Sequence, residues 1–167
     1  AVLVIAVGFF LSIAPSTDRD WTEDQKILAH AEIGTESVTI HNIRNFHYRS
    51  ESDYDARYYD KTFQLDQLES LDFLLSTFSS YHGPAHAFLS FGFQGEQEME
   101  YVSVSVEIRK EKGESYSPFW GLFKQYELSY VIADELDVVK VRTNHRDEPV
   151  YIFPVDTPKA KKQEMFL

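Results

Sequence analysis

A chain of 167 residues, 43% hydrophobic and 15% aromatic, is long enough for one domain with a proper core, whereas two domains would be cramped. Its net charge of -11 and the lack of a basic patch argue against nucleic acid as a partner. The absence of cysteine excludes disulfides, thiolate metal sites and a cysteine nucleophile within these residues. The histidine spacings match no metal motif, since Gly83-Pro84 separates His82 from His86, and we expect neither metal nor cofactor.

Residues 1–15, AVLVIAVGFFLSIAP, carry no charge, but they are too short to cross a hydrocarbon core, which takes about 20 residues. The favoured interpretation is the end of a membrane anchor that begins upstream, with Trp21 at the membrane interface. The alternatives are the apolar part of a signal peptide, cleaved after Ser12-Ile13-Ala14, and a buried core strand. The first two interpretations place the rest of the chain outside the cytoplasm.

Residues 16–35 resemble a polar linker, and residues 36–167 are expected to form an α+β domain with a mainly antiparallel sheet and few helices. Alternating or apolar patterns predict strands at 37–49, 72–78, 86–93, 101–109, 128–133, 136–142 and 150–153. Helical patterns occur at 65–71 and from Pro158 onward, with a loop at 50–61 and a turn at 79–84. Because the last helix is unfinished, we expect the domain to continue past Leu167.

The segment from Tyr101 to Glu135 begins as a strand with two unlike faces and continues as an aromatic loop. We expect Val102, Val104, Val106 and Ile108 to be buried, and Tyr101, Ser103, Ser105, Glu107 and Arg109 to form a polar row. Such a row beside an aromatic loop is typical of a pocket wall, and equally of a half-exposed antiparallel sheet.

Three residues of this segment are candidates for substrate binding. Glu107 and Arg109 share a strand face and could orient a carboxylate or phosphate, or form a surface ion pair worth under about 1 kcal/mol. Tyr116 would line the pocket from the aromatic loop. The acids that follow, Asp134, Glu135 and Asp137, could form a cation site, but three acids at a strand end are typically solvated, and we expect the latter.

Two other residues carry chemistry within strand patterns. His86 opens a strand after the Gly83-Pro84 turn, where an imidazole suits a general base, or simply forms a local hydrogen bond. Arg44 lies amid a strand pattern, where it would be buried and paired, either as a structural tie or as part of a site.

Three segments resemble one known family: VTIHNIRNFHYRSESDYDARYYDKTFQLDQL (Val38 to Leu68), AHAFLSFGF (Ala85 to Phe93) and the stretch from Ser103 to Asn144. Together they resemble the Lnb-type N-terminal periplasmic domain. The resemblance implies an incomplete, rearranged papain-like fold, in which a histidine on a strand precedes a cysteine in an Asn-Cys-Thr segment. His86 matches the histidine, and no residue of this chain matches the cysteine.

The resemblance also implies a function. It is that of a thiol acyltransferase or hydrolase at the bacterial inner membrane, with its domain facing the periplasm, that acts in lipoprotein N-acylation on a lipoprotein or phospholipid substrate. His86 would be catalytic, Glu107, Arg109 and Tyr116 would line the substrate pocket, and these 167 residues alone would be inert. The alternative is a non-catalytic envelope module that holds a lipid, peptide or glycan with its Tyr and Trp residues.

Overall fold

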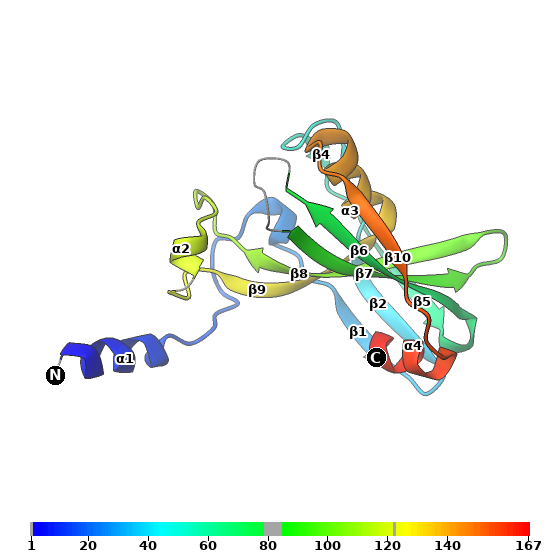
Figure 1. The fold of residues 1–167 in the computed structure, drawn as a ribbon, viewed down its shortest axis with the longest axis horizontal. Coiled ribbons are helices and arrows are strands. Elements are labelled where there is room, and N and C mark those ends of the chain that lie inside the picture. Colours follow the sequence, from blue (N-terminus) through cyan, green and yellow to red (C-terminus); the bar gives the residue numbers. More distant parts are fainter. Residues whose placement is uncertain (1, 79–84, 122) are drawn as a thin grey trace. The chain divides into compact units, whose positions relative to one another are not determined.

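The computed structural model describes residues 2–78, 85–121 and 123–167, so the turn expected at 79–84, with His82, lies outside the described residues. The chain divides into two compact units, coloured by sequence in Figure 1. The smaller unit consists of residues Ala1–Leu28 and Glu107–Ser129, and the larger one of Ala29–Val106 and Tyr130–Leu167.

The larger unit is built on a mixed, mainly antiparallel sheet of eight strands. Hydrogen-bonded neighbours follow the order β1-β2-β9-β8-β7-β6-β10, and β5 also pairs with β2. The pairs β1–β2, β2–β5, β6–β7, β7–β8 and β6–β10 are antiparallel, whereas β2 meets β9 in parallel. The strands are β1 (His30–Ile33), β2 (Ser37–Arg44), β5 (Tyr58–Gln64), β6 (Leu68–Thr77), β7 (Ala85–Gln94), β8 (Met99–Arg109), β9 (Glu127–Asp134) and β10 (Val150–Pro154). The prediction of a mainly antiparallel sheet with few helices is confirmed.

The helical elements of the larger unit are short. They are the 3-10 turn η2 (Leu65–Gln67), α3 (Glu135–Lys140), the π-helical turn η3 (Val141–His145) and α4 (Lys159–Phe166). The helix expected after Pro158 is confirmed. The helix expected at 65–71 is limited to η2, because Leu68 already pairs with Phe93 as the first residue of β6.

The strand predicted at 136–142 is wrong, because this segment is helical. Three valines at 138, 139 and 141 favour a strand, but Asp134 caps a helix by accepting a hydrogen bond from the Leu136 N–H at 2.9 Å. Acids in the first turn and Lys140 in the last complement the helix dipole. Local capping therefore overrides the β propensity of the valines.

The loop predicted at 50–61 is also wrong at 54–55 and 58–61, which are strands. Tyr54–Asp55 form β4, which pairs with β3 (His47–Tyr48), and β5 begins at Tyr58. Phe63 of β5 pairs with Val38 of β2, and both side chains are buried. The pairing with β2 orders a segment whose own sequence has no single period. The strand expected at 37–49 is present, divided into β2 and β3.

The two faces of the sheet carry separate hydrophobic clusters. One is assembled mainly from β2, β5, β6 and β7, and Phe166 of α4 packs its ring against Phe91 and Phe93 at 5.0 Å. The other lies under α3 and contains Leu74, Phe88, Val131, Ala133 and Val138. Figure 1 shows α3 lying across the strands and α4 near the C-terminus. Because helices cover both faces, the middle strands are buried on both sides.

This double coverage corrects the expected faces of β8. Val102 is buried as predicted, but Ser103 and Ser105 on the supposedly exposed face are only 0% and 1% accessible. Val106, expected in the core, is 50% exposed. The polar face of β8 is thus an interior surface.

Gly92 of β7 is required by the close approach of its neighbours. A Cβ at this position would lie 2.3 Å from Ser70 Oγ and 2.8 Å from the Tyr101 ring. We expect Gly92→Ala to lower the free energy of unfolding by about 1–3 kcal/mol, since overpacking of this kind forces backbone shifts. Urea denaturation measures this loss, and Gly8→Ala, whose Cβ meets nothing within 4 Å, is the control. Equal stability of the two variants would contradict the prediction.

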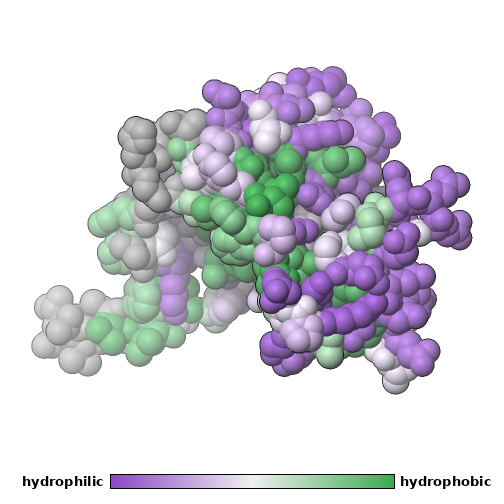
Figure 2. Space-filling model, turned by 45° about the vertical axis from the view of Figure 1, so that its right-hand side comes forward, coloured by the Kyte–Doolittle hydropathy of each residue, from purple (hydrophilic) through white to green (hydrophobic). Residues whose placement is uncertain are grey.

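The smaller unit contains α1 (Val2–Ser12), the 3-10 turn η1 (Glu23–Gln25) and α2 (Pro118–Gly121). The interpretation of this segment as a core strand is wrong, since Val2–Ser12 form a helix. Among the described residues, no helix is long and apolar enough to cross a membrane. In Figure 2 the described residues of α1 are hydrophobic, and the visible surface of the larger unit is mostly hydrophilic.

Candidate functional site

The buried polar face of β6, β7 and β8 is the setting of the candidate site. Residues paired in register form successive rungs across these strands: Ser76 with His86, Phe88 with Ser105, Ser90 with Ser103, and Gly92 with Tyr101. Polar groups at such interior positions must find hydrogen-bond partners or remain costly to bury. The first of these pairs contains His86, and the last contains Tyr101, which lines a pocket.

His86 lies at the start of β7, half-buried, where the strand holds its backbone. Its Nε2 is 2.7 Å from Ser105 Oγ, and its ring stacks on Phe88 with centroids 5.9 Å apart. These two contacts fix the position of the imidazole. A half-buried imidazole held in this way is of the type that can exchange protons with a neighbouring group.

The contact between His86 and Ser105 has the distance of a base and nucleophile pair, but Ser105 is only 1% exposed. A hydroxyl buried to that degree does not meet a substrate. Ser105 therefore orients the imidazole, and a catalytic role of His86 stays a prediction.

A cation and a carboxylate are buried close to His86. The Arg142 guanidinium lies 4.9 Å above the Phe88 ring and donates to the Val138 carbonyl at 2.8 Å. Glu148 accepts a hydrogen bond from Ser76, the register partner of His86, at 3.2 Å. Both groups come from the segment after α3 and stabilise its contact with the strand ends.

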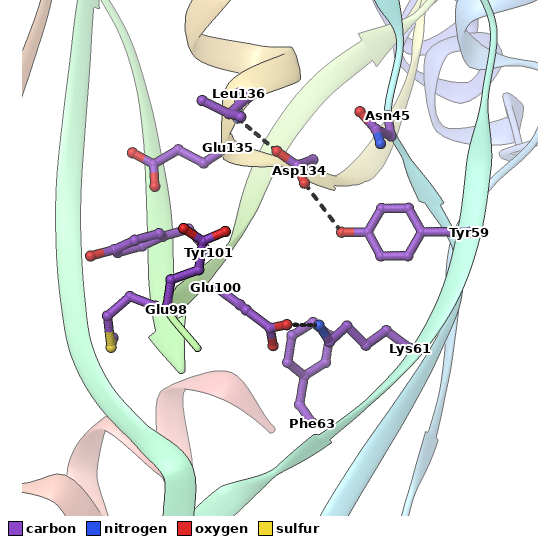
Figure 3. A pocket seen from close by; sticks show the side chains of 11 residues that line it. Asn45, Tyr59, Lys61, Phe63, Glu98, Glu100, Tyr101, Asp134, Glu135 and Leu136 are labelled. Atoms are coloured by element: carbon purple, nitrogen blue, oxygen red, sulfur yellow. Dashed lines mark hydrogen bonds and ion pairs between the residues drawn. The ribbon is translucent and has the colours of Figure 1, made fainter. Parts of the chain in front are cut away.

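A pocket of about 580 Å³ lies at the other end of the rungs, and Figure 3 shows it from close by. It is lined by Asn45, Tyr59, Lys61, Phe63, Glu98, Met99, Glu100, Tyr101, Asp134, Glu135 and Leu136. Glu135 connects it to the polar face, because its Oε2 accepts a hydrogen bond from Ser90 at 3.1 Å. Lys61 forms an ion pair with Glu100.

Burial changes the acid–base properties of two pocket residues. Burial and the nearby Asp134 carboxylate raise the pKa of Tyr59, so its phenol stays protonated and donates to Asp134 at 3.4 Å. Burial also raises the pKa of Glu135, and the charges of Asp72 and Asp134 act in the same direction.

The raised pKa of Glu135 makes stability depend on pH. The folded protein binds this proton more tightly than the unfolded chain, so stability is lost as pH rises from the ordinary carboxyl pKa of about 4.3 through the folded value. We expect Glu135→Gln to stabilise the protein at pH 7, with the gain vanishing below about pH 4. Urea denaturation at both pH values measures this, with the exposed Glu96→Gln as control. A gain that persists at the lower pH would contradict the prediction.

Asp137, expected to be solvated, is instead the most deeply buried acid of its cluster at 1% exposure. Arg44 donates to it from Nε at 3.2 Å and Nη2 at 3.0 Å, and the Phe46 N–H donates at 2.7 Å. Arg44 is therefore a mostly buried structural tie, which is one of the two roles expected of it.

The other predicted site residues belong to the smaller unit. Arg109 is 5% exposed, lies 4.1 Å from the Trp21 ring centroid, and donates to the carbonyls of Gln25 at 2.9 Å and Lys26 at 3.1 Å. Burial lowers the pKa of this guanidinium. Trp21 is 4% exposed, so the expectation that it lies at a membrane interface is wrong.

Glu107 is half-buried and Tyr116 is 63% exposed, with its ring near Tyr126. The structure places His86 in one unit and Glu107, Arg109 and Tyr116 in the other, so a shared site of these four residues stays a prediction. Within the described part of the chain, no three His, Asp or Glu side chains are grouped to hold a metal ion.

Residues 54–167 match the family of the Lnb N-terminal periplasmic domain. The chain belongs to this family. The resemblance inferred from the sequence is thereby confirmed, and the family name places the domain in the periplasm. No curated protein and no solved structure matched the chain.

Sequence reasoning missed the pocket of the Lnb domain. Its residues come from β5, the β7–β8 hairpin and the start of α3, which are far apart in the sequence. The signal that could have indicated it was Ser90, a hydroxyl inside the aromatic run Ala85–Phe93, which pairs with Ser103 and so marks a polar interior face.

Proposed function

We propose that this Lnb domain is the histidine-bearing part of a thiol-dependent acyltransferase or hydrolase of the bacterial envelope. His86 acts as the acid and base, and a cysteine from outside these 167 residues is the nucleophile. Residues 1–15 serve as the membrane anchor, and the acyl groups come from lipoproteins or phospholipids. The observation that supports this most is the imidazole of His86, which Ser105 orients at 2.7 Å. These 167 residues contain no cysteine that could serve as its nucleophile.

The chemistry requires two proton transfers by one imidazole. The thiolate attacks an ester carbonyl, a C–S bond forms and the C–O bond breaks, and protonated His86 gives its proton to the leaving alkoxide. In the second half an amine or water attacks the thioester and gives a proton to His86. The C–S bond then breaks and the thiolate is restored. A rearranged papain-like fold would supply this arrangement, with the histidine on a strand.

Thiol alkylation tests this proposal on the complete protein. We expect acyl transfer from a phospholipid or a lipoprotein to be lost after iodoacetamide treatment, and acyl thioester to accumulate on a cysteine when the acceptor amine is withheld. The isolated 167 residues should have no activity. A complete reading frame without cysteine, or activity that alkylation leaves intact, would exclude a thiol mechanism.

A second candidate function, that of a non-catalytic binding module for a lipid, peptide or glycan, is favoured by the pocket of about 580 Å³. Three aromatic side chains, Tyr59, Phe63 and Tyr101, line it. Such a module would keep its full biological activity when His86 is replaced, whereas the enzyme would not.

A further inference from the structure

The pocket in Figure 3 has a charge distribution that acid–base chemistry at His86 does not require. Four carboxylates, of Glu98, Glu100, Asp134 and Glu135, line it against a single lysine, which is paired with Glu100. In Figure 3 the carboxylates of Asp134 and Glu135 lie beside the same space from the end of β9 and the start of α3. The pocket is therefore electronegative.

Aromatic rings form the walls of this pocket. Tyr59 and Phe63 come from β5 and Tyr101 from β8. A cation placed over such rings gains attraction from their negative faces in addition to its pairing with carboxylates. The half-buried Glu135 carboxylate, with its raised pKa, is the group that a bound cation would stabilise most.

The buried hydroxyls of the neighbouring strands do not belong to the pocket. Ser103 is 0% exposed, and neither Ser103 nor Ser70 is among the residues that line the pocket. A ligand in the pocket therefore meets the carboxylates and the aromatic rings.

We propose that this pocket binds a primary ammonium group. The carboxylates of Asp134 and Glu135 are its counter-ions and accept its N–H bonds, and the rings of Tyr59 and Tyr101 are its walls. The site is distinct from the imidazole, because Ser90, which bonds Glu135, lies four residues from His86, about 13 Å along a strand. It therefore does not depend on the proposed acyl chemistry.

Titration of the 167-residue chain with small amines, followed by two-dimensional ¹H–¹⁵N NMR, tests this site. We expect ethanolamine to bind and to shift the amides around Asp134 and Tyr101. Choline, which carries no N–H, should bind at least tenfold more weakly, and ethylene glycol, which is uncharged, should not bind. Choline affinity equal to that of ethanolamine, or no binding of ethanolamine, would overturn the proposal.

Variants locate the binding. Glu135→Gln should weaken ethanolamine binding about tenfold or more, because it removes a charged partner. Glu96→Gln is the matched control. Glu96 is an exposed acid between β7 and β8, outside the pocket, and its replacement should leave the affinity unchanged. Ser103→Ala changes a buried hydroxyl outside the pocket lining and should leave the affinity unchanged. Equal losses in the Glu135 and Glu96 variants would mean general charge attraction and refute the site.

Primary ammonium groups occur on lipid headgroups and on proteins, and two further titrations distinguish these sources. Glycerophosphoethanolamine represents the headgroup, and a short lysine peptide represents the protein amine. Tighter binding of the first assigns the pocket to a lipid headgroup, and tighter binding of the second to a protein amine. Failure of both to displace ethanolamine would contradict the proposal.

Discussion

Replacement of Asp137 by asparagine is expected to destabilise the Lnb domain by about 3–5 kcal/mol. Asp137 accepts two hydrogen bonds from Arg44 and one from the Phe46 N–H, and its side chain is fully buried. The substitution leaves the Arg44 guanidinium, itself only 13% exposed, without its counter-charge. The free energy of unfolding from urea denaturation measures the loss.

The chain contains a matched control for this experiment. Arg49 donates to Asp53 from Nε at 3.0 Å and from Nη2 at 2.6 Å, which is the same paired geometry as that of Arg44 and Asp137. Both side chains of this pair are more than half exposed, at 54% and 59%. We expect Asp53→Asn to lower the free energy of unfolding far less than Asp137→Asn does, because solvent screens an exposed pair. Similar losses for Asp137→Asn and Asp53→Asn would contradict the assigned role of burial.

A double variant separates the two parts of the effect. Replacement of Arg44 by methionine together with Asp137 by leucine removes both charges at once. We expect it to be less destabilised than Asp137→Asn alone, because the main cost of the single change is a mostly buried cation that has lost its counter-charge. If the double variant is less stable than Asp137→Asn, the interaction between Arg44 and Asp137 itself contributes the stability.

Replacement of His86 by glutamine in the complete protein is expected to lower the rate of acyl transfer by about 10²–10⁴-fold. Glutamine keeps a hydrogen bond to Ser105 within reach, but it does not transfer protons at neutral pH. Initial rates of acyl transfer from phospholipid to an amine acceptor measure the effect. Equal thermal unfolding temperatures of the variant and the natural protein would show that the fold is kept.

Two companion variants sharpen the result. His47→Gln changes an exposed histidine of β3 and should leave the rate unchanged. Ser105→Ala should lower the rate less than His86→Gln and should shift its pH profile, because Ser105 positions the imidazole at 2.7 Å without meeting substrate. An unchanged rate in His86→Gln would refute the proposed role of His86 and favour the binding module.

Local patterns predicted those elements whose sequence alone carries a clear period. β7, β8, β9 and β10 were each expected within one or two residues, as was the helix after Pro158. The errors lie where a distant partner or a cap determines the conformation. β5 is ordered by β2, about 20 residues earlier, and α3 is started by the side chain of Asp134 despite the valines that follow.

The sequence by itself determined the composition limits, the mainly antiparallel α+β class, His86 as the candidate base and membership of the Lnb family. Only the tertiary structure decided which polar groups are buried. Ser103 and Ser105 alternate with apolar residues, and Asp137 lies in an acidic cluster, as solvated residues would. A sequence pattern records polarity and period, but not which element covers a face of the sheet. The cover here is α3, which turns a polar strand face into the interior that joins His86 to the pocket.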